Sequence, residues 1–205
     1  MEKELITMGM LGAFHNVPNV EDTITFKNVL ELLRRIPNPK ILEVGSYCGA
    51  TITNIAEMFP NASCFAIDNF SLEETELQTC RELAEENFSL QDVKNAFLSN
   101  TKGKDVTLIE KDSSLALREF IEQKKLFDFI YVDGSHTSLD TIIDLVLAWL
   151  LLSINGILVI DDYQYTPPGH VDDTPRQAVD CFLRKFKGDY SVLSKGYRMF
   201  LRKIR

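Results

Sequence analysis

The feature that most constrains the fold is a regular alternation of short apolar runs with longer segments of helical periodicity. Each run is followed by a helical segment, which is the pattern of strand–helix units in a parallel sheet. The predicted strands are Lys40–Val44, Cys64–Ile67, Asp105–Ile109, Phe127–Val132 and Gly156–Ile160. The predicted helices cover about 22–36, 50–59, 73–98, 113–123, 138–153 and 175–186. Five such units in series predict an open α/β sheet with helices on both faces.

Two further segments, 192–193 and 198–204, read as a closing pair of strands joined by a turn at Lys195-Gly196. The pair predicts an antiparallel edge strand on a doubly wound, mostly parallel sheet of seven strands. A chain of 205 residues can bury one sizeable core. We therefore expect a single domain over 1–205, with a helical extension at 1–40 and a ligand-binding core at 41–205.

Charge and cysteine content narrow the function. The formal net charge is −8, which disfavours nucleic acid as a substrate because a phosphate backbone attracts basic surfaces. The four cysteines show no C-x-x-C spacing, so a structural zinc site is not expected and reduced thiols of a cytoplasmic protein fit best. The residues after Met1 do not resemble a signal peptide. The most apolar stretch, Leu145–Ile154, is too short to span a bilayer, so no membrane association is expected.

In open α/β sheets ligands bind outside the carboxyl ends of the strands, and the first predicted strand ends there in Glu43-x-Gly45-x-Tyr47-x-Gly49. A dinucleotide turn needs glycine where Tyr47 stands, to admit a pyrophosphate. The acidic Glu43 suits a cationic ligand, such as the ammonium and sulfonium of S-adenosylmethionine. The alternative is an ordinary strand–helix turn with Tyr47 facing the core.

The second and third strands also end in polar residues. Asp68, followed by Asn69, is placed to accept hydrogen bonds from ribose hydroxyls, or else forms a local turn. Asp112 and Ser113 could contact an adenine edge, cap the helix that follows, or do both.

Three carboxylates follow the fourth and fifth strands. Asp133 ends one strand, and Asp161 and Asp162 end the other. If the two strands are neighbours, these negative charges converge, and their proximity is costly unless something positive joins them. Oxygen ligands favour Mg²⁺ or Ca²⁺. The alternative is that Asp161 caps the turn and Asp162 faces solvent.

His136 lies three residues after Asp133, in the same predicted loop. An imidazole can accept a proton near neutral pH, so His136 is the candidate general base, with a packed or surface role as the alternative. His170 is the second candidate. It lies in a loop at 163–174 that reads as a lid over the site.

The segment Ile41–Gly49 resembles the first motif of catechol O-methyltransferase-like enzymes. Residues 131–136 together with 156–163 resemble the methyltransferase 24 family, which includes macrolide sugar O-methyltransferases with a metal site and a histidine base. The resemblance covers most of the chain and implies a Rossmann-like class I methyltransferase fold. Catechol enzymes carry Asp-Asn where this chain has Asp161-Asp162, so their substrate does not carry over.

The resemblance implies a role for each matching position. Cofactor contacts fall on Glu43, Gly45, Ser46, Tyr47, Gly49, Thr51, Asp68, Asn69, Asp112, Ser113 and Asp133. Magnesium ligands fall on Asp133, Asp161 and Asp162, and catalysis on His136 and Asp133.

The resulting hypothesis is metal-assisted O-methylation of a small hydroxylated molecule by S-adenosylmethionine, with His136 removing the hydroxyl proton. A homodimer is expected by analogy with the fold class. Two alternatives stay open. One is a binding or regulatory module that keeps the cofactor pocket without catalysis. The other is a nucleotide-dependent dehydrogenase, which Tyr47 disfavours.

Overall fold

The computed structural model describes residues 20–71, 89–166 and 173–205. Within these ranges the chain forms one mixed sheet of seven strands in the order β3-β2-β1-β4-β5-β7-β6. The strands are β1 (Lys40–Val44), β2 (Ser63–Ile67), β3 (Val106–Ile109), β4 (Phe127–Val132), β5 (Leu152–Ile160), β6 (Tyr190–Lys195) and β7 (Met199–Lys203). The first five are mutually parallel, and β7 is antiparallel to β5. The predicted fold class is confirmed.

The closing pair has a more specific arrangement than the sequence indicated. Strand β7 inserts between β5 and β6, so the antiparallel strand is internal and β6 forms the edge. Strand β5 also begins at Leu152, four residues before the predicted Gly156. The preceding helix ends at Leu151, and the chain turns directly into the strand.

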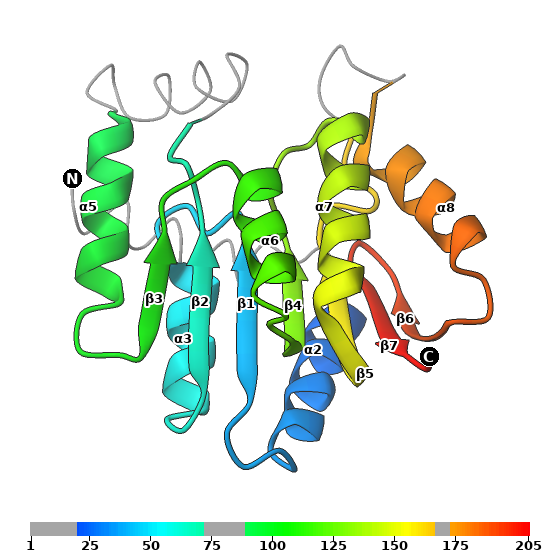
Figure 1. The fold of residues 1–205 in the computed structure, drawn as a ribbon, viewed down its shortest axis with the longest axis horizontal. Coiled ribbons are helices and arrows are strands. Elements are labelled where there is room, and N and C mark those ends of the chain that lie inside the picture. The colour runs from blue at the N-terminus through cyan, green and yellow to red at the C-terminus, as the bar shows by residue number, and fades with distance from the viewer. Residues whose placement is uncertain (1–19, 72–88, 167–172) are drawn as a thin grey trace.

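Helices cover both faces of the sheet (Figure 1). One face carries α2 (Val20–Leu33), α3 (Ala50–Met58) and α5 (Leu90–Asn100), whose apolar side chains share one core cluster with the sheet. The other carries α6 (Ser113–Glu122), α7 (Ser138–Leu151) and α8 (Pro175–Lys185), around a second cluster. The part of the predicted helix 73–98 up to residue 88 lies outside the described residues. None of the helices in the described ranges is long and apolar enough to cross a membrane.

The order in which successive strands are added to the sheet reverses between β1 and β4, which are themselves parallel. From β1 the chain runs outward to β2 and β3, then returns to β4 on the opposite side of β1. The two halves of the sheet therefore diverge at the carboxyl ends of β1 and β4, which is where α/β sheets bind ligands.

Candidate active site

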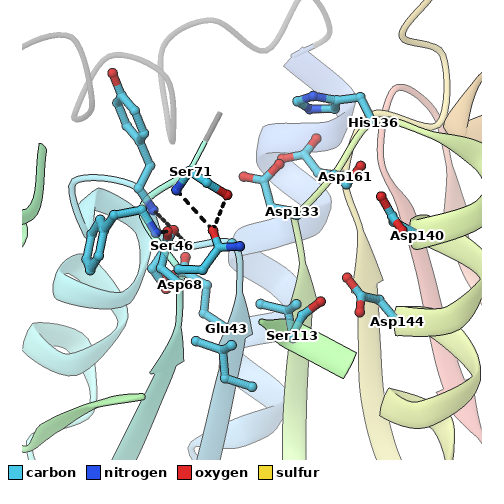
Figure 2. Close-up of a pocket in the computed structure, with 18 of the residues that line it drawn as sticks. Glu43, Ser46, Asp68, Ser71, Ser113, Asp133, His136, Asp140, Asp144 and Asp161 are labelled. Carbon is cyan, nitrogen blue, oxygen red and sulfur yellow. Dashed lines mark hydrogen bonds between the residues drawn. The ribbon is translucent and has the colours of Figure 1, made fainter. Parts of the chain in front are cut away.

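A cavity of about 780 Å³ opens at the carboxyl ends of the parallel strands. Its wall is built from the turns after β1 to β5, with helix α7 along one side (Figure 2). Most of the predicted site residues line it: Glu43, Gly45, Ser46, Tyr47, Thr51, Asp68, Asn69, Asp112, Ser113, Asp133, His136 and Asp161. Gly49 and Asp162 lie outside this wall. Gly49 packs under Phe97 at a positive φ of 75°, and Asp162 bonds to His136 at the rim.

The turn after β1 is held by the carboxylate of Asp68. Its Oδ2 accepts the backbone N–H groups of Ser46 at 2.8 Å and Tyr47 at 2.6 Å, and its Oδ1 accepts that of Phe70 at 2.6 Å. Tyr47 and Phe70 both have positive φ, of 46° and 49°, a conformation that is costly for bulky residues. Asp68 therefore stabilises two strained positions. Burial raises the pKa of Asp68, and the same three hydrogen bonds oppose that rise.

Gly45 lets β1 and β4 approach closely where they leave the sheet. The backbone N–H of Asp133 donates to the carbonyl of Val44 at 2.8 Å. Gly45 has φ of +80°, and a Cβ at this position would lie 2.0 Å from the carbonyl oxygen of Asp133. No side chain fits there, so the glycine of the first motif serves backbone packing as well as ligand access.

Two polar side chains at the base of the cavity have unused hydrogen-bonding capacity. Glu43 is 2% exposed and Ser46 is 5% exposed. Glu43 Oε2 and Ser46 Oγ have no well-aligned hydrogen-bond partner among the described residues, although the Ser46 side chain lies close enough to Glu43 to lower its pKa. Burial raises the pKa of Glu43 to about 8. Buried polar atoms are almost always paired, so this pair marks a place built for a polar ligand.

The side of the cavity next to β3 is formed by the start of α6. Asp112 accepts the N–H of Leu115 at 3.3 Å and the hydroxyl of Ser114 at 2.6 Å, so it caps the helix. Ser113 lines the cavity beside Asp144 of α7, as Figure 2 shows. Asp144 was not predicted as a site residue, because it lies in the middle of an apolar helix with no motif around it.

The carboxylates after β5 are paired by side chains from the turn between β6 and β7. Asp161 Oδ2 accepts from Arg198 Nε at 2.9 Å and from the hydroxyl of Tyr131. Asp162 accepts from the hydroxyl of Tyr197. Arg198 and Asp161 have side chains only 6% and 7% exposed, so this is a buried ion pair. The sequence analysis did not predict the positive charge that the guanidinium of Arg198 places beside Asp161.

His136 lies between the carboxylates of Asp133 and Asp162, and the three side chains form a cluster. The Nε2 atom of His136 lies 2.7 Å from Asp162 Oδ2. Within the described ranges, Asp133, His136 and Asp162 each offer one ligand atom, and these atoms lie within 4.8 Å of one another. The structure thus brings together two of the three predicted metal ligands, with His136 in the third place. The predicted third ligand, Asp161, is engaged by Arg198.

The charges of the three aspartates are strongly coupled. Burial, together with the neighbouring carboxylates of Asp161 and Asp162, raises the pKa of Asp133 well above its usual value. Burial alone would raise the pKa of Asp162, but its hydrogen bonds from His136 and Tyr197 outweigh that effect and the pKa is lowered. A cluster in which one carboxyl resists ionisation is a place where an added cation would be stabilised.

Tyr165 covers the outer side of His136, with ring centroids 4.9 Å apart. It belongs to the loop predicted as a lid, of which the structure describes 163–166 and 173–174. His170, the second candidate base, lies outside the described residues, so its predicted role stays a prediction.

The fold and cavity together are those of a Rossmann-like methyltransferase. A family model described as a methyltransferase domain matches residues 42–163, which is more than half of the chain. The chain belongs to this methyltransferase family, and the resemblance noted at residues 41–49, 131–136 and 156–163 is confirmed. No curated protein sequence matches the chain.

Several solved structures share the fold at low sequence identity. The MycE methyltransferase from the mycinamycin biosynthetic pathway, in complex with Mg and SAH, matches with a TM-score of 0.66 and 15% identity. That match covers 100% of this chain and 55% of MycE, so this chain spans little more than half of MycE. An O-methyltransferase from Bacillus cereus in complex with SAH matches with a TM-score of 0.61 and 13% identity, covering 100% of this chain and 90% of that one.

Proposed function

We propose that the protein is an S-adenosylmethionine-dependent O-methyltransferase that acts on a small hydroxylated molecule with the help of a divalent cation. The observation that carries the proposal is the buried couple of Glu43 and Ser46 at the base of the cavity, whose Oε2 and Oγ have no well-aligned hydrogen-bond partner among the described residues. The ammonium group of a methionine moiety would lower the raised pKa of Glu43, so a carboxylate and a hydroxyl would then face that ammonium group. The family assignment and the SAH-bound relatives support the same ligand.

The strand order arranges the rest of the cofactor site. Asp68 follows β2, next to the turn that holds Glu43, and its place suits the ribose hydroxyls. Because its oxygens already accept three N–H groups, Asp68 would share them between the turn and the ribose. Asp112 and Ser113 follow β3 and border the place proposed for adenine.

The oxygen donors proposed for a magnesium ion are Asp133, Asp161 and Asp162. Asp133 and Asp162 already converge, while Asp161 would divide its carboxylate between the ion and Arg198. Carboxylates are the ligands that Mg²⁺ prefers, and the relative MycE was solved with Mg. When bound, S-adenosylmethionine supplies an electrophilic methyl group, and the cation lowers the pKa of the acceptor hydroxyl.

His136 is proposed as the base that takes the acceptor's proton, on the ring nitrogen that does not donate to Asp162. Its other nitrogen, Nε2, lies 2.7 Å from Asp162 Oδ2, so the imidazolium formed would have a carboxylate beside it. Tyr165 packs against the ring at an interplanar angle of 59° and restricts its orientation. The acidic net charge of −8 supports a small acceptor rather than nucleic acid.

The proposal is tested in two stages. Titration with S-adenosylhomocysteine should raise the melting temperature, because a ligand that binds the folded state stabilises it, whereas NAD should not. Methyl transfer from labelled S-adenosylmethionine to a library of hydroxylated acceptors should stop with a chelator and return with Mg²⁺. His136→Ala should bind S-adenosylhomocysteine as tightly as the wild type and lose turnover. A melting shift with NAD alone would overturn the proposal, and full turnover in chelator would remove the cation.

A further inference from the structure

Helix α7 carries a buried carboxylate that no part of the proposed reaction uses. Asp144 is 2% exposed, although it lines the cavity. The segment that surrounds it, Ile142–Leu151, is almost entirely apolar. An aspartate is rarely buried on such a face unless a partner compensates for the lost hydration.

The neighbours of Asp144 leave its carboxyl group directed at the cavity. The Ser113 side chain, at the start of α6, hydrogen-bonds to Asp144. On the other side lies Gly134, where an added Cβ would sit 3.1 Å from Asp144 Oδ2. A side chain at 134 would therefore crowd the carboxyl group. The lack of a side chain there, between β4 and α7, keeps the carboxyl group accessible from the cavity (Figure 2).

The position of Asp144 along the cavity determines which part of the cofactor it can contact. The unpaired atoms of Glu43 and Ser46 mark the amino-acid end, after β1. Asp68 follows β2, and Ser113, the partner of Asp144, follows β3. Asp144 therefore belongs to the end of the cavity beyond the ribose position. The group expected there is the neutral purine, which offers an exocyclic amino donor next to a ring-nitrogen acceptor.

A carboxyl group in this environment can match that edge. Burial raises the pKa of Asp144 to about 7, so the group can carry a proton near neutrality. A protonated carboxyl presents a donor and an acceptor side by side. A charged carboxylate presents acceptors only and would still accept from the amino group. Either form therefore accepts a hydrogen bond from the six-amino group, which a purine with hydrogen at that position does not offer.

We propose that Asp144, held by Ser113 and left accessible by Gly134, is the residue that recognises the six-amino edge of the cofactor's adenine. This inference rests on the proposed function and goes beyond it by assigning the specificity of the adenine end to a residue of α7. Asp144 is a binding residue in this assignment and has no part in the proton transfer at His136.

The experiment compares two ligands that differ only at that edge. Dissociation constants are measured by calorimetry at pH 7 for S-adenosylhomocysteine and for its six-deamino analogue, in which hydrogen replaces the six-amino group. The wild type should prefer the adenosyl ligand by about tenfold or more, since a site built to bond an N–H group rejects an analogue that lacks it. In Asp144→Ala the preference should fall to about twofold or less.

Two further variants keep the test decisive. Asp144→Leu is close in size and has no hydrogen-bonding group, so it should fold among the apolar residues of α7 and should lose most of the preference. Asp180→Asn changes an aspartate of the neighbouring helix α8 that does not line the cavity, and it should keep the wild-type preference. Melting curves of each free protein report whether the variant is folded.

The outcomes separate this inference from the proposed function. If the wild type binds neither ligand, the proposed function fails. If the wild type binds both equally, or if folded Asp144→Ala and Asp144→Leu retain the wild-type preference, Asp144 does not recognise adenine and the inference is overturned. Should the alanine variant not fold, the leucine variant alone decides.

Discussion

The two ends of the cavity hold their carboxylates by different means. At the β1–β2 end, Asp68 is bonded by three backbone N–H groups, those of Ser46, Tyr47 and Phe70. At the β4–β5 end, Asp161 accepts a single backbone N–H, that of Asp162, and the two aspartates are otherwise bonded by side chains, with Arg198 on Asp161. One end is therefore fixed by the path of the main chain, and the other by side chains that can be exchanged one at a time.

This difference separates a preformed part of the site from an adjustable part. Backbone donors cannot rotate away without changing the turn, so the cofactor end keeps its shape whatever occupies it. A guanidinium or a phenol can move by changing a rotamer, so the acidic end can rearrange when a cation arrives. Three variants test this contrast. One changes the end fixed by the backbone, one changes the end fixed by side chains, and one changes Glu43 at the base of the cavity.

The largest effect is expected at the backbone-built end, from Gly45→Ala. The added Cβ would lie 2.0 Å from the Asp133 carbonyl oxygen, at a φ of +80°. Urea unfolding should show a loss of about 4–5 kcal/mol or no folded protein at all. The matched control is Gly103→Ala, which has φ of +78° but no atom within 4 Å of the new Cβ. It should lose only about 1–2 kcal/mol, and equal losses in both would show that the close approach is unimportant.

A smaller but substantial effect is expected at the side-chain-built end, from Arg198→Met. The change leaves Asp161 buried without its cation, and breaking a buried ion pair from one side costs about 3–5 kcal/mol. The double variant Asp161→Asn with Arg198→Met should recover much of that loss, because no charge is then left unpaired. Strictly additive losses in this double-mutant cycle would mean that the pair is not coupled.

The smallest effect is a pH dependence at Glu43. Its pKa is about 8 when folded, against 4.5 for the unpaired group, so the folded state binds the extra proton between these values. The stability that Glu43 contributes in its protonated form is therefore complete below about pH 4.5 and is lost as the pH rises through 8. Relative to Glu43→Gln, the ligand-free wild type should lose about 2 kcal/mol between pH 5 and pH 7. A constant difference in urea unfolding over that range would contradict the raised pKa.

Local features of the sequence were sufficient to predict the five parallel strands and the turn after β1. The apolar runs mark β1 to β5, and the polar residue that ends each run falls at the cavity. Asp68 was identified for the same reason, and its alternative role in a local turn is present in its bond to Phe70. Such residues are found from sequence because the strand that precedes each of them places it at the carboxyl edge of the sheet.

The partners of the acidic end were not predicted, for the opposite reason. Arg198 lies 37 residues from Asp161, and Tyr197 lies 35 residues from Asp162. Their contacts depend on the insertion of β7 between β5 and β6, which the sequence pattern of the closing pair did not indicate. Asp144 was missed because its helix reads as apolar core, and only the packing of α7 beside α6 places it at the cavity.

The place of β7 in the sheet also has a consequence for the order in which the site is completed during synthesis. The residues that hold the cofactor turn all precede residue 71, whereas Tyr197 and Arg198 leave the ribosome near the end of the chain that the structure describes. Because a domain generally folds as a unit, the pairing of Asp161 and Asp162 with these residues waits until β7 has been synthesised. The acidic end is therefore the last part of the site to receive its partners, and a chain interrupted before residue 197 would leave Asp161 without Arg198 and Asp162 without Tyr197.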